Sequence, residues 1–583
     1  MTTALIAVMI GIPWLGAVVV WWIGDRHENL QHWLAVVFSV IAGGASVMLI
    51  PQAASGTAVT IPMGGGTFGD FTFVADGLGV FLSAIAAVIG SLAVIFSTSY
   101  MKGEDSLGRY YAFVLFFIGA MVGLVLSSNL LLMFFFWEIT ALCSYALISF
   151  HNDDPKAVRG GLKALIITSL GGVGLLVGAV VIYAYTGSYD INGFLASKSE
   201  LPTNILALLA FGFLIAASAK SAQFPFQTWL PDAMEAPSPI SALIHAATMV
   251  NAGVYLLARF YPAFQDVPFW REAVMMVGML SAILAAVMAL TSTDLKRVLA
   301  YSTVSQLGYM FYAIGSGSVF ASQFHLFSHS IFKALLFLAA GAVIHSVGTR
   351  DMREMGGVGK KMPLVKWVFI IGSLALAGLP IMNGFWSKEL ILEAGLSGGP
   401  IWLYILMVGV TGLTALYTTR CVWLVFFGEA RSDYPVHPVG VGMKVALIPL
   451  ALAAGISWLV VEPFSKLLGE NTLPYHGIET TTLPALVHEV LSLPTLAVLV
   501  VIGLGILTWF RRSRLKGLIN SMRSIRWASE NSFGFEAVNT AFVEATNNIA
   551  EALRSTQTGI LNWNVLGIIA SVIVLFAIVA LGG

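Results

Sequence analysis

The sequence predicts an all-α integral membrane protein with about 16 transmembrane helices. Of its 583 residues, 58% are hydrophobic and only 10% are charged, whereas an ordinary soluble domain carries about 25% charged residues. Apolar runs of about 20 residues, the length that crosses a bilayer, recur along the chain, and the mean hydropathy is +0.86. Two runs are interrupted by prolines or glycines beside a lysine, a pattern typical of broken helices around ion sites.

The predicted spans follow one another with short connections. They lie at 4–23, 32–51, 78–99, 110–127, 130–149, 162–185, 203–222, 239–260, 270–291, 296–315, 322–346, 364–395 with a break, 400–427, 442–462, 488–510 and 560–582. The first run has no basic segment before it and no evident cleavage site, which favours a retained span over a signal peptide. The order predicts six parts: N-terminal spans (1–109), a first five-helix repeat (110–262), a second five-helix repeat (263–427), C-terminal spans (428–510), an amphipathic lateral helix (511–559) and a final transmembrane helix (560–583).

The distribution of basic residues predicts the orientation in the membrane. With the N-terminus outside, the outer loops hold little beyond Lys198, Arg271 and Lys466. The inner loops then hold Arg26, Lys102, Arg109, Lys156, Arg159, Lys163, Lys296, Arg297, Arg350, Arg353, Lys360, Lys361, Lys366, Arg431, Arg511, Arg512, Arg514 and Lys516. Because inner loops carry the excess of Lys and Arg, we expect a multi-pass cell (inner) membrane protein with both termini outside. The formal net charge of zero does not point to a nucleic-acid partner.

Residues 511–559 are too polar to span the membrane. Their apolar positions recur at steps of three and four residues: Phe535, Val538, Phe542, Ala545, Ile549 and Leu553. This pattern predicts an amphipathic helix on the inner face, lying before the last span. Two interpretations stay open, a helix that packs on its own bundle or on lipid, and a lateral element that clasps a neighbouring subunit.

The first interrupted segment, residues 219–260, is the centre of the prediction. Lys220 ends one apolar run, four prolines follow within 20 residues, and His245 lies in the next run. A lysine inside a bilayer costs roughly 2.5–3.5 kcal/mol, and a broken helix is tolerated there only where it faces protein or water. The second break, in 364–395, carries Lys388. The two breaks, each with a lysine, occupy corresponding positions in two blocks of five spans, which predicts two inverted repeats.

Further ionisable residues lie inside other spans. Glu138 occupies an otherwise uncharged run, where a buried carboxylate needs a partner such as Lys220. A static ion pair that only fixes packing is the structural alternative. His325, His329 and Lys333 recur every four residues, so they share one helix face over roughly 12 Å. Histidine and buried lysine both exchange protons near neutral pH, which favours a relay.

Cofactor sites are not indicated. His325 and His329 lack the third ligand of a metal site, and His245 is the only other histidine placed to ligate haem. Cys143 and Cys421 are too few for an iron–sulfur cluster, which takes about four ligands. We therefore expect no cofactor in this chain, and any redox chemistry would belong to partner subunits.

Four motifs resemble the antiporter-like subunits of respiratory complex I and of its relatives, the Mrp antiporters and membrane-bound hydrogenases. They are FVADGLGVFL with YMKGE, NLLLMFFFWEITALCSYALI, KSAQFPFQTWLPDAMEAPSPISALIHAATMV, and STVSQLGYMFYAIG followed by HLFSHSIFKALLFLAAGAVIH. The span count and the amphipathic helix are most similar to the large L-type subunit. The sixth span reads SLGG where that subunit has Arg and Asp, and Asn251 stands where some relatives have lysine, so the branch stays open.

The resemblance implies a role for each ionisable residue. Glu138 and Lys220 would form the input pair, and Lys333 would be the central relay lysine. His245, His325 and His329 would link it through water, and Lys388 would be the output residue facing the outer side.

The sequence thus predicts a proton- or sodium-translocating subunit of a complex I-like assembly, without redox chemistry of its own. Its partners would be other antiporter-like and small membrane subunits, and redox subunits with iron–sulfur clusters. Whether the assembly is an NADH:quinone-type translocase is left open. The alternatives are a subunit of a multi-subunit Na⁺/H⁺ antiporter or of an ion-driven inorganic carbon uptake complex, a free-standing secondary transporter, and a purely structural scaffold.

Overall fold

The computed structural model is built almost wholly of helices, and it describes the chain except residues 26, 56–57, 62–69, 433–437, 479, 491, 516, 518–520 and 556–583. The helices are α1 Thr2–Ile23, α2 Glu28–Leu49, α3 Gly77–Tyr100, α4 Leu107–Leu126, α5 Leu130–Ile148, α6 Pro155–Thr186, α7 Ile191–Ser197, α8 Thr203–Lys220, α9 Trp229–Asp232, α10 Ser238–Ala242, α11 Met249–Phe264, α12 Trp270–Thr291, α13 Leu295–Gly315, α14 Val319–Val347, α15 Val358–Lys361, α16 Pro363–Ala377, α17 Asn383–Gly398, α18 Ile401–Phe426, α19 Val441–Ile456, α20 Val461–Leu467, α21 Leu483–Val490, α22 Leu493–Phe510, α24 Arg523–Glu530 and α25 Phe535–Ser555. A short antiparallel hairpin pairs β1 Ala58–Ile61 with β2 Phe71–Val74.

Thirteen helical segments among the described residues are long and apolar enough to cross a membrane, which confirms a multi-pass helical membrane protein. The predicted span at 296–315 is helical as α13, but its many polar side chains keep it out of that set. The break at Gly378 divides the predicted span at 364–395 into α16 and α17. The predicted last span, 560–582, lies outside the described residues.

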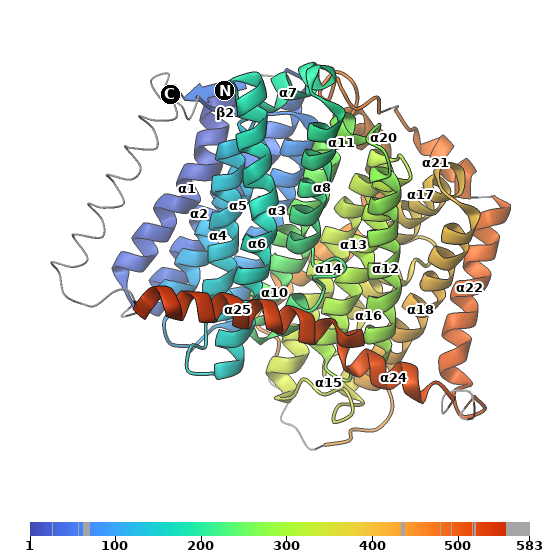
Figure 1. The fold of residues 1–583 in the computed structure, drawn as a ribbon. Coiled ribbons are helices and arrows are strands. Elements are labelled where there is room, and N and C mark those ends of the chain that lie inside the picture. The colour runs from blue at the N-terminus through green and yellow to red at the C-terminus, as the bar shows by residue number, and fades with distance from the viewer. Residues whose placement is uncertain are drawn as a thin grey trace. The chain divides into compact units, whose positions relative to one another are not determined.

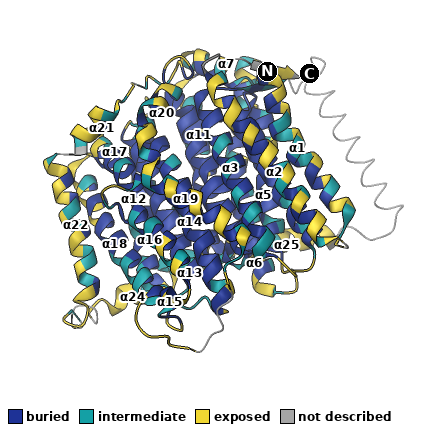
Figure 2. Cartoon of the chain, turned by 180° about the vertical axis from the view of Figure 1, so that it is seen from behind, coloured by how far each residue is buried: buried dark blue, intermediate teal, exposed yellow. Residues whose placement is uncertain are grey.

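The interior of the first compact unit, Met1–Phe533, lies around the helix that follows the first break and the helices packed on it. Every residue of the segment Ser238–Phe264 is buried, as is most of α14, whereas α1 and α22 expose much of their length (Figure 2). Helices α3, α11, α13 and α14 therefore form the core, and the outer helices present apolar side chains to the surroundings, as lipid contact requires.

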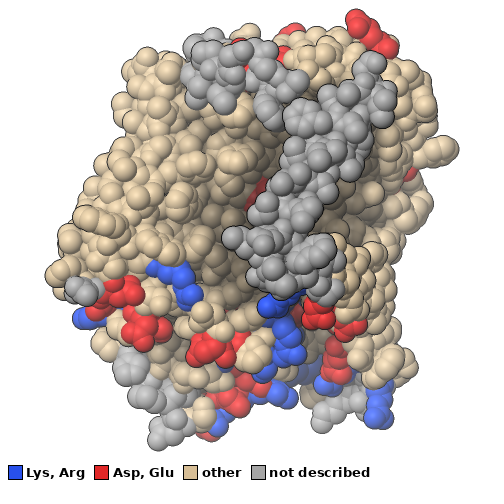
Figure 3. Space-filling view, turned by 60° about the vertical axis from the view of Figure 1, so that its left-hand side comes forward, with Lys and Arg blue, Asp and Glu red and all other residues tan. Residues whose placement is uncertain are grey.

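Charged side chains on the face shown in Figure 3 gather toward one end, and the wall above them is nearly free of charge. Figure 1 shows the molecule turned by 60° about the same vertical axis, and there the end of the first unit with α15 and α24 is opposite the end with α7 and β2. An uncharged belt bounded by a charged end is the arrangement that a bilayer selects.

The backbone is broken at both predicted places. Between α8 and α11 the chain forms the short helices α9 and α10 and a π-helical turn, Leu243–Ala247, which contains His245. Gly378 ends α16 with a φ of 78°, a left-handed conformation that glycine adopts without steric cost, and α17 begins at Asn383. His245 and its π-helical turn in the first break are buried within protein, which is the condition for irregular backbone at membrane depth, whereas the second break has a buried Gly378 followed by the exposed Pro380 and Ile381.

In the described part of the segment predicted as one amphipathic helix, α24 and α25 are separate helices. α24 belongs to the first compact unit and contacts α12, where the hydroxyls of Thr291 and Ser529 lie 2.9 Å apart. Ser532, Phe533 and Gly534 all have positive φ, which ends a right-handed helix. α25 begins at Phe535 in the second unit, Gly534–Gly583, and its apolar side chains share one face.

Candidate functional site

Lys220 lies at the end of α8, immediately before the first break. Its side chain is fully buried, and its amino group donates a hydrogen bond of 2.7 Å to the carbonyl oxygen of Trp137 on α5. The amino nitrogen also lies 4.8 Å from the centre of the Trp137 ring, a distance suited to a cation–π contact. Trp137 therefore holds the lysine by its backbone and by its ring.

Glu138 lies beside this group but does not contact Lys220. One carboxylate oxygen accepts a hydrogen bond of 2.7 Å from Ser169 of α6, and the other is buried without a partner. A Cβ atom at Gly172 would lie 2.6 Å from that second oxygen, so the glycine leaves room for it. The structure brings the two predicted input residues together around Trp137, yet no ion pair joins these two described side chains.

Lys333 lies at the centre of the molecule, on α14. Its amino group bonds to the Ser302 hydroxyl and, at 3.2 Å, to the Leu299 carbonyl oxygen, both on α13. It is fully buried, and no ion pair with a carboxylate is formed by this lysine in the described part of the chain. Burying an ammonium group with only neutral partners is costly, and such groups mark ion pathways.

The three predicted histidines differ in their hydrogen bonds. His325 is bonded at both ring nitrogens: Nδ1 is 2.9 Å from the Ser387 hydroxyl and Nε2 is 3.2 Å from the Gln306 side-chain oxygen. His245 and His329 are fully buried, and neither ring has a hydrogen-bond partner among the described residues. The His325 and His329 rings have centres 6.4 Å apart, so the predicted stripe on α14 is present.

Lys388 lies on α17, beyond the second break. Its amino group donates a hydrogen bond of 2.8 Å to the carbonyl oxygen of Leu376, which the early end of α16 leaves accessible. The same nitrogen lies 5.5 Å from the centre of the Tyr309 ring. The break thus supplies the acceptor for the lysine that follows it.

α13 carries none of the predicted site residues, yet it contacts Lys333, His325 and Lys388. Its partners follow steps of three or four residues: the Leu299 carbonyl and Ser302 for Lys333, Gln306 for His325, and Tyr309 for Lys388. All lie on one buried face. In the sequence, the spacing of the polar residues in STVSQLGYMFYAIG already indicates that one face of this helix is polar.

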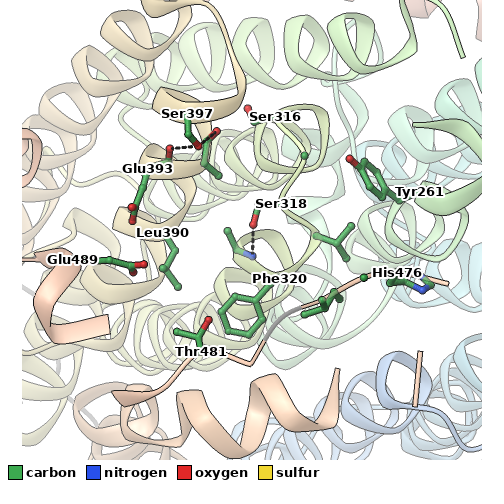
Figure 4. Close-up of a pocket in the computed structure, with 16 residues that line it drawn as sticks. Tyr261, Ser316, Ser318, Phe320, Leu390, Glu393, Ser397, His476, Thr481 and Glu489 are labelled. Atoms are coloured by element: carbon green, nitrogen blue, oxygen red, sulfur yellow. Dashed lines mark hydrogen bonds between the residues drawn. The ribbon is translucent and has the colours of Figure 1, made fainter. Parts of the chain in front are cut away.

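Carboxylates line two cavities next to Lys388. Glu389 accepts a hydrogen bond of 3.1 Å from Thr495 and lines a cavity of about 100 Å³ with Glu393 and Glu489. Glu393 and Glu489 also line an adjoining cavity of about 390 Å³, where their carboxylate ends approach one another (Figure 4). Burial, and then the neighbouring Glu393, raise the pKa of Glu489 in the short helix α21 to about 7.

The loop after α20 covers a buried ion pair at the same end of the molecule. Arg259 of α11 forms two bonds to the carboxylate of Asp76, which also caps the first turn of α3. His476 from the loop lies 3.0 Å from the Ala258 carbonyl oxygen. Burial, and then the Arg259 charge, lower the pKa of His476 to about 4.

At the opposite end, a cavity of about 510 Å³ lies at the start of α13. Asp294, Arg297 and Tyr301 line it, together with Arg350 of the following loop. Tyr301 immediately precedes Ser302, which binds the Lys333 amino group. Water in this cavity would therefore lie near the α13 turn that binds Lys333.

Within the described residues, no group of three or more His, Cys, Asp or Glu side chains has the arrangement of a metal site. Cys143 and Cys421 are buried free thiols. The prediction that any redox cofactor belongs to partner chains stays a prediction.

Two broken helices and the buried lysines and histidines near them define a polytopic membrane protein with ionisable side chains in its core. Residues 127–414 match the family model described as NADH:quinone oxidoreductase/Mrp antiporter, transmembrane, and residues 65–111 match the N-terminus of NADH-ubiquinone oxidoreductase (complex I) chain 5. The chain belongs to this family of antiporter-like membrane subunits.

Curated relatives and solved structures agree with this family. NAD(P)H-quinone oxidoreductase chain 5 of Synechocystis sp. is 40% identical over 71% of this chain and 62% of its own length. The same subunit of Picosynechococcus sp. is 39% identical over 72% of this chain and 67% of its length. This chain thus spans about two thirds of these relatives, and about half of the chloroplast subunits, such as that of Nymphaea alba, which is 42% identical.

Two solved complexes contain chains of similar fold. The match in the Mrp complex from Dietzia sp. DQ12-45-1b has a TM-score of 0.81 and 27% identity, and it covers 100% of this chain and 63% of the other. The match in the archaeal membrane-bound sulfane sulfur reductase has a TM-score of 0.72 and 25% identity, and it covers 83% of this chain and 99% of the other.

Proposed function

We propose that this chain is a proton- (or sodium-) translocating subunit of a complex I-like assembly, and that redox chemistry in partner subunits drives it. The observation that carries the proposal is the buried polar stripe from Lys333 through His325 to the region of Lys388. Lys333 and Lys388 have only neutral hydrogen-bond partners, so their charges are costly for stability and useful for ion transfer.

Glu138 and Lys220 are proposed as the input pair. Both lie beside Trp137, and each has a neutral partner that holds it when the pair is open: Ser169 for the carboxylate and the Trp137 carbonyl for the amine. Movement of either side chain would bring the opposite charges into contact. Such a contact changes how firmly the lysine holds its proton, which is the coupling step that the mechanism requires.

Lys388 is proposed as the output residue. Glu389, the next residue, lines the smaller of two cavities that share Glu393 and Glu489 and also contact α21. Carboxylates at such an exit would accept and release cations to the outer aqueous phase. The cavity at Asp294 and Tyr301 is the proposed inlet from the inner side, because it adjoins the α13 turn that binds Lys333.

The finer architecture belongs to the same proposal. We propose 16 spans, two inverted five-helix repeats, both termini outside, and α25 as a lateral amphipathic helix on the inner membrane face, packed on its own bundle or lipid, or on a neighbouring subunit. The basic loops and the apolar face of α25 support this arrangement. Partner membrane subunits and iron–sulfur redox subunits complete the proposed assembly.

A second candidate is a subunit of a multi-subunit Na⁺/H⁺ antiporter without redox coupling. The match to the Dietzia Mrp complex, which covers the whole chain, favours it. An ion-driven inorganic carbon uptake complex would use the same membrane machinery with a different soluble partner.

Purification of the native complex from membranes distinguishes these assemblies. We expect redox subunits with iron–sulfur clusters to co-purify, visible by mass spectrometry and by their electron paramagnetic resonance signals. Co-purification of small membrane subunits alone would overturn the redox-driven proposal in favour of the antiporter. A zinc-containing soluble partner would overturn it in favour of carbon uptake.

A further inference from the structure

The Ser387 hydroxyl has two possible acceptors for its single hydrogen. Its oxygen lies 2.9 Å from Nδ1 of His325 and 3.0 Å from the carbonyl oxygen of Asn383, one turn earlier on α17. A hydroxyl carries one donor hydrogen and two acceptor lone pairs, so it can donate to only one of these atoms at a time. Which of the two atoms accepts this hydrogen therefore depends on whether Nδ1 of the His325 ring is protonated.

Gln306 fixes the other side of the same ring. Its side-chain oxygen lies 3.2 Å from Nε2 of His325, and its side-chain nitrogen has no partner among the described residues. With this oxygen as the acceptor, Nε2 carries a hydrogen in both the neutral and the cationic ring. The proton that distinguishes these two forms is the one at Nδ1, facing Ser387.

We propose that Ser387 is a positioning residue whose hydroxyl rotates to satisfy both protonation states of His325; this inference rests on the ion-translocating function proposed above. With a neutral ring, Ser387 donates to Nδ1. With a cationic ring, Nδ1–H donates to the Ser387 oxygen, and the hydroxyl turns to the Asn383 carbonyl. The ring gains one proton at Nδ1 from an ammonium or hydronium ion on the pathway, and the hydroxyl keeps its own hydrogen.

This arrangement sets His325 apart from the two other buried histidines. Neither His245 nor His329 has a hydrogen-bond partner at either nitrogen in the described chain, so no protein group there compensates a cationic ring. His325 has satisfied bonds in both states without any backbone movement. Ser387 immediately precedes Lys388, so the hydroxyl that changes its acceptor lies on the same helix as the proposed output lysine.

Replacement of Ser387 tests the switch in the assembled complex. Ser387→Ala removes the acceptor for Nδ1–H and the donor to Nδ1, so we expect ion movement to fall at least 10-fold with normal assembly. Ser387→Thr keeps the hydroxyl and should restore at least half of the activity. Ser322→Ala is the matched control: Ser322 lies one turn before His325 on α14, is fully buried, and its hydroxyl has no partner among the described residues.

Infrared difference spectra between acid and alkaline pH give a second readout. The ring bands of His325, assigned by subtraction of His325→Gln spectra, should show both neutral and cationic forms in the wild type and the neutral form alone in Ser387→Ala. Gln306→Leu should also alter the ring bands, and it replaces the first variant if that one does not assemble.

Two outcomes would overturn the inference. One is wild-type ion movement in Ser387→Ala, and the other is loss of movement with unchanged His325 bands and no recovery in Ser387→Thr. The infrared spectra test this inference separately from the proposed function. The two ring states of His325 can be observed even in a complex that moves no ions.

Discussion

Replacement of Lys333 by methionine separates the proposed role of this lysine in ion transfer from any role in packing. Methionine has a similar length and volume but carries no charge and releases no proton. We expect Lys333→Met to abolish ion movement while the chain folds and assembles at least as well as the wild type.

The magnitude follows from the partners of the lysine. The variant loses two hydrogen bonds from a charged donor, worth about 1.5–3 kcal/mol each. It also removes a fully buried charge that has no carboxylate partner among the described residues, and that charge costs several kcal/mol. Ser302 is not left unsatisfied, because its hydroxyl donates to the Leu299 carbonyl oxygen at 2.8 Å. The two contributions oppose each other and are similar in size, so we expect the free energy of unfolding to change by no more than about 3 kcal/mol.

The assay compares thermal unfolding of the purified complex with ion movement in vesicles, for the wild type, Lys333→Met and Lys333→Arg. Arginine keeps its proton at any physiological pH, so Lys333→Arg should also be inactive although it retains the charge. Strong destabilisation of Lys333→Met would show that the lysine is structural. Ion movement at the wild-type rate in either variant would remove Lys333 from the pathway.

Two further predictions concern the end of the molecule that carries the α20–α21 loop. Asp76→Asn should lower the free energy of unfolding by about 3–5 kcal/mol, because it leaves the buried Arg259 guanidinium unpaired. Asp351→Asn, at the more exposed pair with Arg353, should lower it by under about 1 kcal/mol. Equal losses of the two variants in denaturant unfolding would contradict the burial argument. The pKa of His476 is about 4 in the closed loop and about 6.5 when the loop opens, so the closed loop holds the neutral ring. The free energy of loop opening is therefore highest above pH 6.5 and should fall by about 2 kcal/mol by pH 5. Hydrogen exchange of the loop at pH 7 and pH 5 measures this loss, and the same pH dependence in His476→Gln would refute it.

The sequence was sufficient to predict features that depend on helical periodicity. His325, His329 and Lys333 are four residues apart, so any α-helix places them on one face, as α14 does. Pro225 and Pro239 cannot continue a regular helix, and Gly378 allows a left-handed turn, so the two breaks were also predictable. These features need no knowledge of which helices are neighbours.

Contacts between helices could not be predicted in the same way. Ser169 holds Glu138 away from Lys220 because α6 is packed against α5 at Gly172, and nothing in the local sequence specifies that pairing. The polar partners on α13 were missed because Ser302 and its neighbours also suit an ordinary buried helix. The division of the amphipathic segment depends on three successive positive φ angles at 532–534, which non-glycine residues rarely adopt.

Ion movement in membrane vesicles that contain the complete complex with Lys220→Ala tests the central claim most directly. Lys198→Ala, at a partly exposed pair with Asp266, is the matched control. The account predicts normal amounts of assembled complex, ion movement lost in Lys220→Ala, and ion movement retained in Lys198→Ala. Wild-type ion movement in Lys220→Ala would contradict the account, and loss of the protein from the membrane would show instead that Lys220 stabilises the fold.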